Sequence, residues 1–171
     1  MELILMRHPP VFGGDGRCYG RLDLAADVST IPACLAVLAF RRGLPVYASP
    51  ARRCLQLAYA LDENVTVWDE LQELDFGTWE GRRWDEIDRA ELDDWAEDIW
   101  NYRPGGGESA AMLRARWRLA VMRWQSMNLD RAVVVTHAGV IRTALAEAGL
   151  IGEDERWNKT IAYATAYTLN V

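Results

Sequence analysis

The sequence predicts an α/β fold, a three-layer α/β/α sandwich built around a mostly parallel central sheet. Short apolar runs rich in β-branched residues alternate along the chain with longer segments whose apolar residues recur at helical spacing. This alternation is typical of parallel strands connected by helices that cover both faces of the sheet. With 171 residues, half of them hydrophobic, the chain is long enough for one domain, which we expect to span residues 1–171.

The first half of the chain contains three expected strands, at residues 2–6, 44–49 and 64–68. A loop over residues 9–24 follows the first strand and is too rich in glycine and proline to be regular. Residues 28–43 are apolar at helical spacing and end at a glycine, the residue type favoured just after a helix. Ser49 and Pro50 are suitable as N-cap and first-turn residue for a second helix, which ends near residue 61.

The second half adds a loop, three helical segments and two strands. The loop "DELQELDFGTWEG" covers residues 69–81, and acidic helical turns with tryptophans run from Trp84 to Trp100. "RPGGGES" interrupts the helical pattern, and Ser109 is placed to cap a long helix that reaches about Met127. The remaining elements are a strand, a helix and a terminal strand, at residues 131–136, 138–150 and 162–171.

The composition limits the class of partner. The formal net charge is −6 and the sequence pI is near 5.0, which argues against a nucleic-acid polymer, because such a partner requires a basic face. A small anionic substrate stays open, since local arginines decide whether it binds. The chain shows no charged leader and no run of ~18 apolar residues, so we expect no membrane partner and a cytoplasmic location.

The cysteines indicate neither a disulfide framework nor a structural zinc site. Cys18, Cys34 and Cys54 are odd in number, widely spaced and form no CxxC pair. We interpret them as free thiols of a protein in a reducing compartment. The sequence leaves the oligomeric state open.

The residues with chemical potential follow directly on predicted strands: Arg7 and His8, Arg52 and Arg53, Glu73, and His137. Ligands of open α/β sheets bind beyond the carboxyl ends of the strands. His8 and His137 are the only two histidines of the chain. A lone histidine is more often structural, but two at equivalent strand ends indicate one shared site.

Phosphoryl transfer fits two histidines accompanied by arginines best. A zinc site would need a third ligand, and the chain has neither HExxH nor a G-x-S-x-G nucleophile elbow. Arginine forks bind the equatorial oxygens of a transferring phosphoryl group, and a neutral imidazole attacks phosphorus. Glu73 is the candidate proton donor for the leaving alcohol. Burial and nearby arginines have opposite effects on its protonation, which the sequence leaves open.

Five segments together resemble the histidine phosphatase superfamily, also called phosphoglycerate mutase-like. "LMRHPP" is similar to the family's R-H-G motif, "SPARRC" to S-P-L-x-R, and "LQELDFGTWEG" to L-x-E-x-x-F-G-x-W-E-G. "PGGGES" and "THAGVIR" match two further segments. The resemblance spans nearly the whole chain and implies a phosphoglycerate mutase-like sheet in a single histidine phosphatase domain, with no metal and no other cofactor.

The resemblance also implies roles for individual residues. The nucleophile would be His8, the proton donor Glu73, and the groups around the phosphoryl group Arg7, Arg53, His137 and the amide of Ala138. Arg53 rather than Arg52 occupies the arginine position of the motif, so we expect Arg52 to point outward. His137 would stabilise the phosphoryl group during its transfer.

Two positions depart from the family pattern. Pro9 replaces the usual glycine and has no amide to donate, and Leu57 stands where threonine is common. Two roles are open for the glycine that the family has at this position: its amide binds substrate, or its small size only eases close packing. The loop "RHPPV…CYGRLDL" is similar to the α-ribazole phosphatase branch of cobalamin assembly, in which Arg21 would add a phosphate contact and Tyr19 would line the entrance.

The leading hypothesis is a metal-independent phosphomonoesterase for a small phosphorylated metabolite, α-ribazole 5′-phosphate. Mutases of the family are typically longer and close over the substrate, so the short chain favours hydrolysis. The alternatives are a mutase or broad small-metabolite phosphatase, a phosphate-binding protein without turnover, and a two-histidine metal hydrolase. The tryptophans that would cap the site are either core residues or a stacking platform for an aromatic base: Trp79, Trp84, Trp95 and Trp100.

Overall fold

The central sheet has five strands in the order β3-β2-β4-β1-β5 in the computed structural model, which describes residues 1–41, 43–153 and 155–171. The strands are β1 (Glu2–Arg7), β2 (Val46–Ala48), β3 (Val65–Val67), β4 (Arg131–Thr136) and β5 (Ala166–Asn170). The first four pair in parallel, whereas β5 pairs antiparallel with β1. The prediction of a mostly parallel α/β sheet is confirmed.

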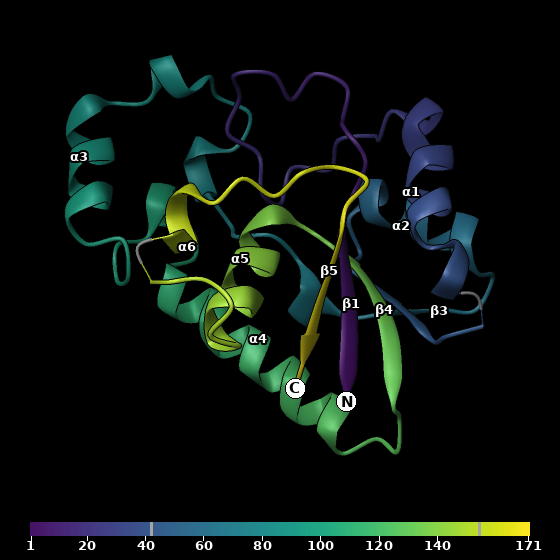
Figure 1. Ribbon diagram of the computed structural model, residues 1–171. Coiled ribbons are helices and arrows are strands. Elements are labelled where there is room, and N and C mark those ends of the chain that lie inside the picture. The colour runs from purple at the N-terminus through teal and green to yellow at the C-terminus, as the bar shows by residue number, and fades with distance from the viewer. Residues whose placement is uncertain (42, 154) are drawn as a thin grey trace.

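Helices cover both faces of this sheet (Figure 1). They are α1 (Ile31–Val37), α2 (Arg52–Leu61), α3 (Arg89–Glu97), α4 (Ala110–Gln125), α5 (Ala138–Glu147) and α6 (Glu155–Asn158). α1 and α2 lie on one face and α4 and α5 on the other, which makes the three predicted layers. Among the described residues, no helix is long and apolar enough to cross a membrane.

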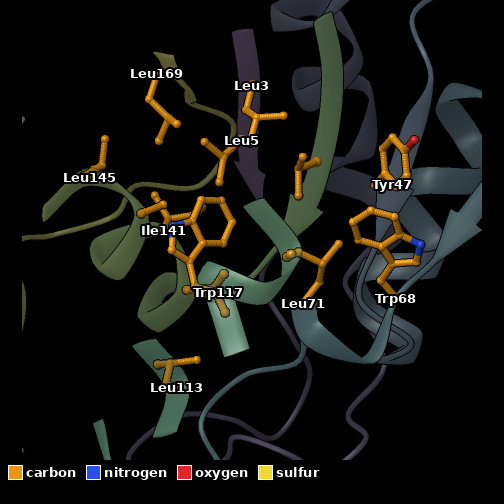
Figure 2. Close-up of a cluster of buried hydrophobic side chains, with 14 of the residues drawn as sticks. Leu3, Leu5, Tyr47, Trp68, Leu71, Leu113, Trp117, Ile141, Leu145 and Leu169 are labelled. Atoms are coloured by element: carbon orange, nitrogen blue, oxygen red, sulfur yellow. The ribbon is translucent and has the colours of Figure 1, made fainter. Parts of the chain in front are cut away.

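The side chains of β1 are buried on both faces of the sheet, so helices must cover both faces. Successive side chains of a strand point to opposite faces, and Leu3, Ile4, Leu5 and Met6 are all fully buried. Leu3 and Leu5 join the cluster under α4 and α5, where Trp117 fills the centre (Figure 2). Residues 4 and 6 pack against α1 and α2 instead. A strand buried on both faces reads as the continuous apolar run seen in the sequence.

The prediction of one continuous helix over residues 28–43 is wrong. The structure divides it into a 3-10 turn at Val28–Thr30, α1, and a second 3-10 turn at Ala39–Arg41. Pro32 lies in the first turn of α1, and proline is tolerated there but not within a continuing helix. Arg42, which the predicted helix included, lies outside the described residues.

The expected N-cap of the second helix is also wrong. α2 begins at Arg52, with Ala51 in the N-cap position. Ser49 does not serve as the cap because it lies at the end of β2, where its hydroxyl contacts the ring of His137. Ser109, in contrast, caps α4 as predicted by accepting a hydrogen bond from a backbone amide of the first turn.

The loop after β3 is fixed by close backbone contact with residues 104–107. Gly77 has φ +53°, and a Cβ atom there would overlap the carbonyl oxygen of Gly105, so a side chain is excluded. The amide of Glu108 donates to the carbonyl oxygen of Asp75 at 2.8 Å. These contacts hold the segment that carries Glu73 against the start of α4.

Candidate active site

Three parallel strands end at one edge of the sheet and bring the two histidines together. His8 follows β1, Ser49 follows β2 and His137 follows β4. The ring centroids of His8 and His137 lie 5.2 Å apart in an edge-to-face arrangement, and both side chains are buried. The site thus lies beyond the carboxyl ends of the strands, where open α/β sheets bind ligands.

His8 is held as a neutral imidazole. Its Nδ1 lies 2.7 Å from the carbonyl oxygen of Pro9, and because a carbonyl only accepts, Nδ1 carries the proton and Nε2 keeps its lone pair. Burial, together with the charges of Arg53 and Arg7, lowers the pKa of His8 to about 3. Proline retains the carbonyl that this contact uses, so the departure at position 9 leaves the orientation of His8 intact.

His137 lies beside His8 and is completely buried. The Nη2 of Arg53 lies 3.2 Å from its Nδ1, and the Oγ of Ser49 lies 2.7 Å from its Nε2. A guanidinium only donates, so Nδ1 is the unprotonated nitrogen and the Nε2–H donates to Ser49. Burial, followed by the proximity of His8 and Arg53, lowers the pKa of His137 well below its ordinary value.

Four arginines line a cavity of about 310 Å³ in front of His8: Arg7, Arg17, Arg53 and Arg142. Within the part of the chain that the structure describes, the Nε atoms of Arg7 and Arg53 are buried and have no hydrogen-bond partner. Buried donors are normally paired, and these two unpaired atoms belong to side chains that line the cavity. An anion with several oxygens, such as a phosphate, fits this set of cations.

Arg53, and not Arg52, faces the site. Arg53 is fully buried and donates to the carbonyl oxygens of Gly20 and Leu22, whereas the side chain of Arg52 is exposed. Leu57, the second departure from the family pattern, lies one turn further along α2 and packs in the apolar core rather than in the site.

The carboxylate of Glu73 lines the same cavity and is fixed by two backbone amides. Its Oε1 accepts from the amide of Leu74 at 2.9 Å, and its Oε2 accepts from the amide of Gly139 at 3.0 Å. Gly139 lies in the first turn of α5, and a Cβ atom there would overlap the Oε1 of Glu73. Only a glycine at this position lets the carboxylate approach the helix terminus so closely.

The loop that carries Tyr19 is clamped between two charged side chains. The carboxylate of Glu80 accepts from three consecutive backbone amides of residues 20–22, and Arg53 binds two carbonyl oxygens of the same loop. Tyr19 lines the cavity of His8, with its ring 5.4 Å from the Cζ of Arg53. Ala138 is the first residue of α5 and is buried directly after His137.

Arg21 lies in a neighbouring cavity and contacts the main chain of the proton-donor candidate. Its Nε donates to the carbonyl oxygen of Glu73 at 3.0 Å, and its Nη1 donates to the side chain of Gln72 at 2.7 Å. Arg116 supports the same segment through the carbonyl oxygen of Gln72 and pairs with the buried Glu108 through two contacts of 2.7 and 2.8 Å. In this geometry Arg21 positions Glu73.

The sequence analysis missed several residues of the site: Arg17, Ser49, Glu80, Glu108, Arg116 and Arg142. Arg142 had a usable signal, because it stands three residues after Gly139 and therefore on the same side of α5. Glu80 and Glu108 lie within motifs that were identified, but nothing in the spacing showed what their carboxylates bind. The contacts of Arg116 depend on how α4 packs against the rest of the protein, and the spacing of apolar residues in the sequence does not determine that packing.

The set of side chains does not suit a metal ion. Over the described ranges, no group of three or more histidine, cysteine, aspartate or glutamate side chains could hold one. Arginines surround His8 instead, and their charges repel a cation.

The fold and the site define an α/β protein with a histidine- and arginine-lined cavity at the sheet edge. The family model of the histidine phosphatase superfamily (branch 1) matches residues 3–171. This chain belongs to that superfamily.

Individual relatives agree with this assignment. A glucosyl-3-phosphoglycerate phosphatase from Mycolicibacterium vanbaalenii is 31% identical over 172 residues, which cover 88% of this chain and 74% of that protein. The alpha-ribazole phosphatase from Shigella flexneri superposes with a TM-score of 0.86 at 20% identity, covering 100% of this chain and 91% of that chain. A phosphoglycerate mutase from Thermus thermophilus gives a TM-score of 0.76 at 25% identity, over 98% and 92% of the two chains. These similarities confirm the phosphoglycerate mutase-like fold.

The low pKa of His8 predicts a particular pH dependence of stability. The unfolded chain binds a proton at His8 near pH 6.5 and the folded protein near pH 3, so the free energy of unfolding falls as the pH is lowered through that window. His8→Asn removes this contribution, and the decline becomes shallower by up to about 1.4 kcal/mol per pH unit. Urea unfolding at pH 6.5, 5.5 and 4.5 in phosphate-free buffer measures it, and equal slopes for variant and wild type would contradict the assignment.

Proposed function

We propose that the protein is a metal-independent phosphomonoesterase that works through a phosphohistidine intermediate on His8. The observation that carries the proposal is the state of His8, a neutral imidazole with an unprotonated Nε2, in a cavity lined by four arginines. A neutral imidazole is a nucleophile, and the arginines supply the charge that a phosphoryl group in transfer requires. The membership of the superfamily and the phosphatase named among the relatives support the same activity.

In the first step, the Nε2 lone pair of His8 attacks phosphorus and forms the N–P bond. The bond between phosphorus and the ester oxygen breaks, and the leaving oxygen takes the proton of the Glu73 carboxyl to depart as an alcohol. Arg7 and Arg53, whose side chains line the cavity, bind the equatorial oxygens. His137 accepts from Arg53 at its Nδ1 and stabilises the transferring group through that guanidinium.

In the second step, water attacks the phosphohistidine from the side that the alcohol has left. The Glu73 carboxylate accepts a proton from this water, the N–P bond breaks, and His8 regains its lone pair as inorganic phosphate departs. Each group returns to its starting state, so one carboxyl serves as acid and then as base. The backbone amides that fix Glu73 keep it in reach for both steps.

For the substrate, we propose α-ribazole 5′-phosphate, within cobalamin assembly in the cytoplasm. The loop around Tyr19 and Arg21 supports this choice through its similarity to the α-ribazole phosphatase branch. The glucosyl-3-phosphoglycerate phosphatase among the relatives supports a second candidate, a phosphatase for sugar-linked phosphoglycerates or other small metabolites. In both cases one histidine phosphatase domain over residues 1–171 carries the activity.

The direct test is phosphate release from α-ribazole 5′-phosphate, 3-phosphoglycerate and p-nitrophenyl phosphate, measured side by side in excess EDTA. We expect chelator-resistant release with a strong preference for α-ribazole 5′-phosphate. Release from p-nitrophenyl phosphate alone would contradict the proposed substrate but agree with the proposed mechanism. Activity that disappears in EDTA would contradict the mechanism, and no release from any of the three esters would indicate a binding protein.

The role of Glu73 as proton donor predicts that Glu73→Gln affects substrates unequally. An alkyl phosphate needs a proton on its leaving oxygen, so we expect its kcat to fall by roughly 10²–10⁴-fold, the usual contribution of general acid catalysis. Nitrophenolate leaves without a proton, so phosphorylation of His8 by p-nitrophenyl phosphate should slow much less in a single-turnover burst measurement. Glu63→Gln, an exposed carboxylate outside the site, is the matched control, and an equal loss for both substrates would contradict the role.

A further inference from the structure

A second cavity, of about 140 Å³, adjoins the catalytic one beyond Glu73. The two share the side chains of Glu73, Phe76 and Arg142, but His8 lines only the first. An in-line displacement places the leaving oxygen on the side of phosphorus opposite the nucleophile, and the proton donor must lie within reach of that oxygen. The organic part of the alcohol therefore extends past Glu73, to where the second cavity begins.

The lining of the second cavity is mainly apolar. Its apolar side chains include three aromatic rings, Phe76, Trp95 and Trp157, beside Ile99 and Leu113, and its polar side chains are Glu73, Arg142, Thr143 and Arg156. Trp95 and Trp157 are only half-buried, unlike Trp117, which is fully enclosed in the main core. Half-buried aromatic rings that face a cavity are available to a ligand.

Aromatic side chains connect the two cavities without a break. Trp84 lines the catalytic cavity and stacks on Trp95 with ring centroids 6.3 Å apart and planes 6° apart. Phe76 meets both rings edge-on, at 5.8 and 6.0 Å. Of the four tryptophans, Trp79 is fully buried in a core cluster against which Trp95 also packs. Trp84 and Trp95 line the cavities. Trp100 lines neither of these two cavities and packs edge-on against Trp157.

Most of the polar side chains at this cavity already have partners. Arg156 is buried and pairs with Glu153 through two contacts of 3.0 Å, Arg142 donates its Nε to the carbonyl oxygen of Lys159 at 2.8 Å, and Glu73 accepts from two backbone amides. Thr143 is the remaining polar side chain of the lining. A sugar with several hydroxyls therefore finds few partners here, and each unpaired buried polar group costs on the order of 1–3 kcal/mol. A planar apolar group carries no such cost.

The volume of the second cavity also fits an aromatic ring. A cavity of about 150 Å³ with an apolar lining is known to hold one benzene ring, and this cavity measures about 140 Å³. Another cavity beside Glu73 is lined by polar side chains, among them Arg21, Asp23, Gln72, Ser49 and His137, and the described residues give it no aromatic ring other than the imidazole of His137. It therefore suits a polar group rather than an apolar ring.

We propose that the cavity formed by Phe76, Trp95, Ile99, Leu113 and Trp157 binds a planar aromatic ring carried by the leaving alcohol of the phosphomonoester. This site selects substrates by their alcohol half, and its assignment rests on the proposed phosphatase function. It makes Trp95 and Trp157 specificity-determining residues, with no part in the chemical steps.

The test compares 2-phenylethyl phosphate with ethyl phosphate, two alkyl esters that differ only by the ring. Burial of a ring of this size favours the first ester by roughly 10- to 100-fold in kcat/KM. In Trp157→Ala and Ile99→Asn, we expect this preference to fall about tenfold while kcat/KM for ethyl phosphate stays within about twofold of wild type. Phe40→Ala, which removes an aromatic ring that is 90% exposed away from both cavities, is the control and keeps the full preference.

Each outcome has a definite meaning. Equal kcat/KM for the two esters in the wild type, or a preference unchanged in both variants, would overturn the aromatic site and leave the phosphatase standing. If neither ester is hydrolysed, the proposed function fails, and calorimetric binding of the same two esters decides the site. Tighter binding of 2-phenylethyl phosphate that is lost in both variants supports the site, and equal dissociation constants overturn it.

Discussion

The buried guanidinium of Arg53 is the constraint on which the rest of the site depends. It carries a full charge with no exposure to solvent, and the partners of its terminal nitrogens are neutral: two carbonyl oxygens of the loop at residues 20–22 and the ring of His137. Burying a charge is costly unless an opposite charge compensates it. In the proposed function a phosphoryl group provides that charge.

The same constraint explains the protonation of the histidines. Burial disfavours a charged imidazole, and a cation beside it favours the neutral ring further, so the pKa values of His8 and His137 lie below the ordinary value. The neutral form is the one that a nucleophile needs. The backbone carbonyl of Pro9 then selects which nitrogen keeps the lone pair. Burial, charge and one backbone contact thus hold His8 as a neutral ring with a free lone pair on Nε2.

The sequence predicted the parts of this arrangement that follow from strand ends and missed those that follow from packing. His8 and His137 were identified because each directly follows a buried strand, and parallel strands end at one edge. Ser49 was assigned to a helix cap because local propensity does not register the ring that approaches from β4. The phosphate contact expected of Arg21 stays a prediction, and the sequence did not indicate that Arg21 also binds the carbonyl oxygen of Glu73. Tertiary contacts decide such cases.

Trapping the covalent intermediate tests whether His8 receives the phosphoryl group. The protein is mixed with p-nitrophenyl phosphate, quenched in alkali, where a phosphohistidine survives, and mapped by peptide mass spectrometry. We expect one phosphoryl group on the peptide that contains His8, and none in His8→Ala with its fold intact by circular dichroism. Phosphate on another residue, or turnover that persists in His8→Ala, would show that His8 is not the nucleophile.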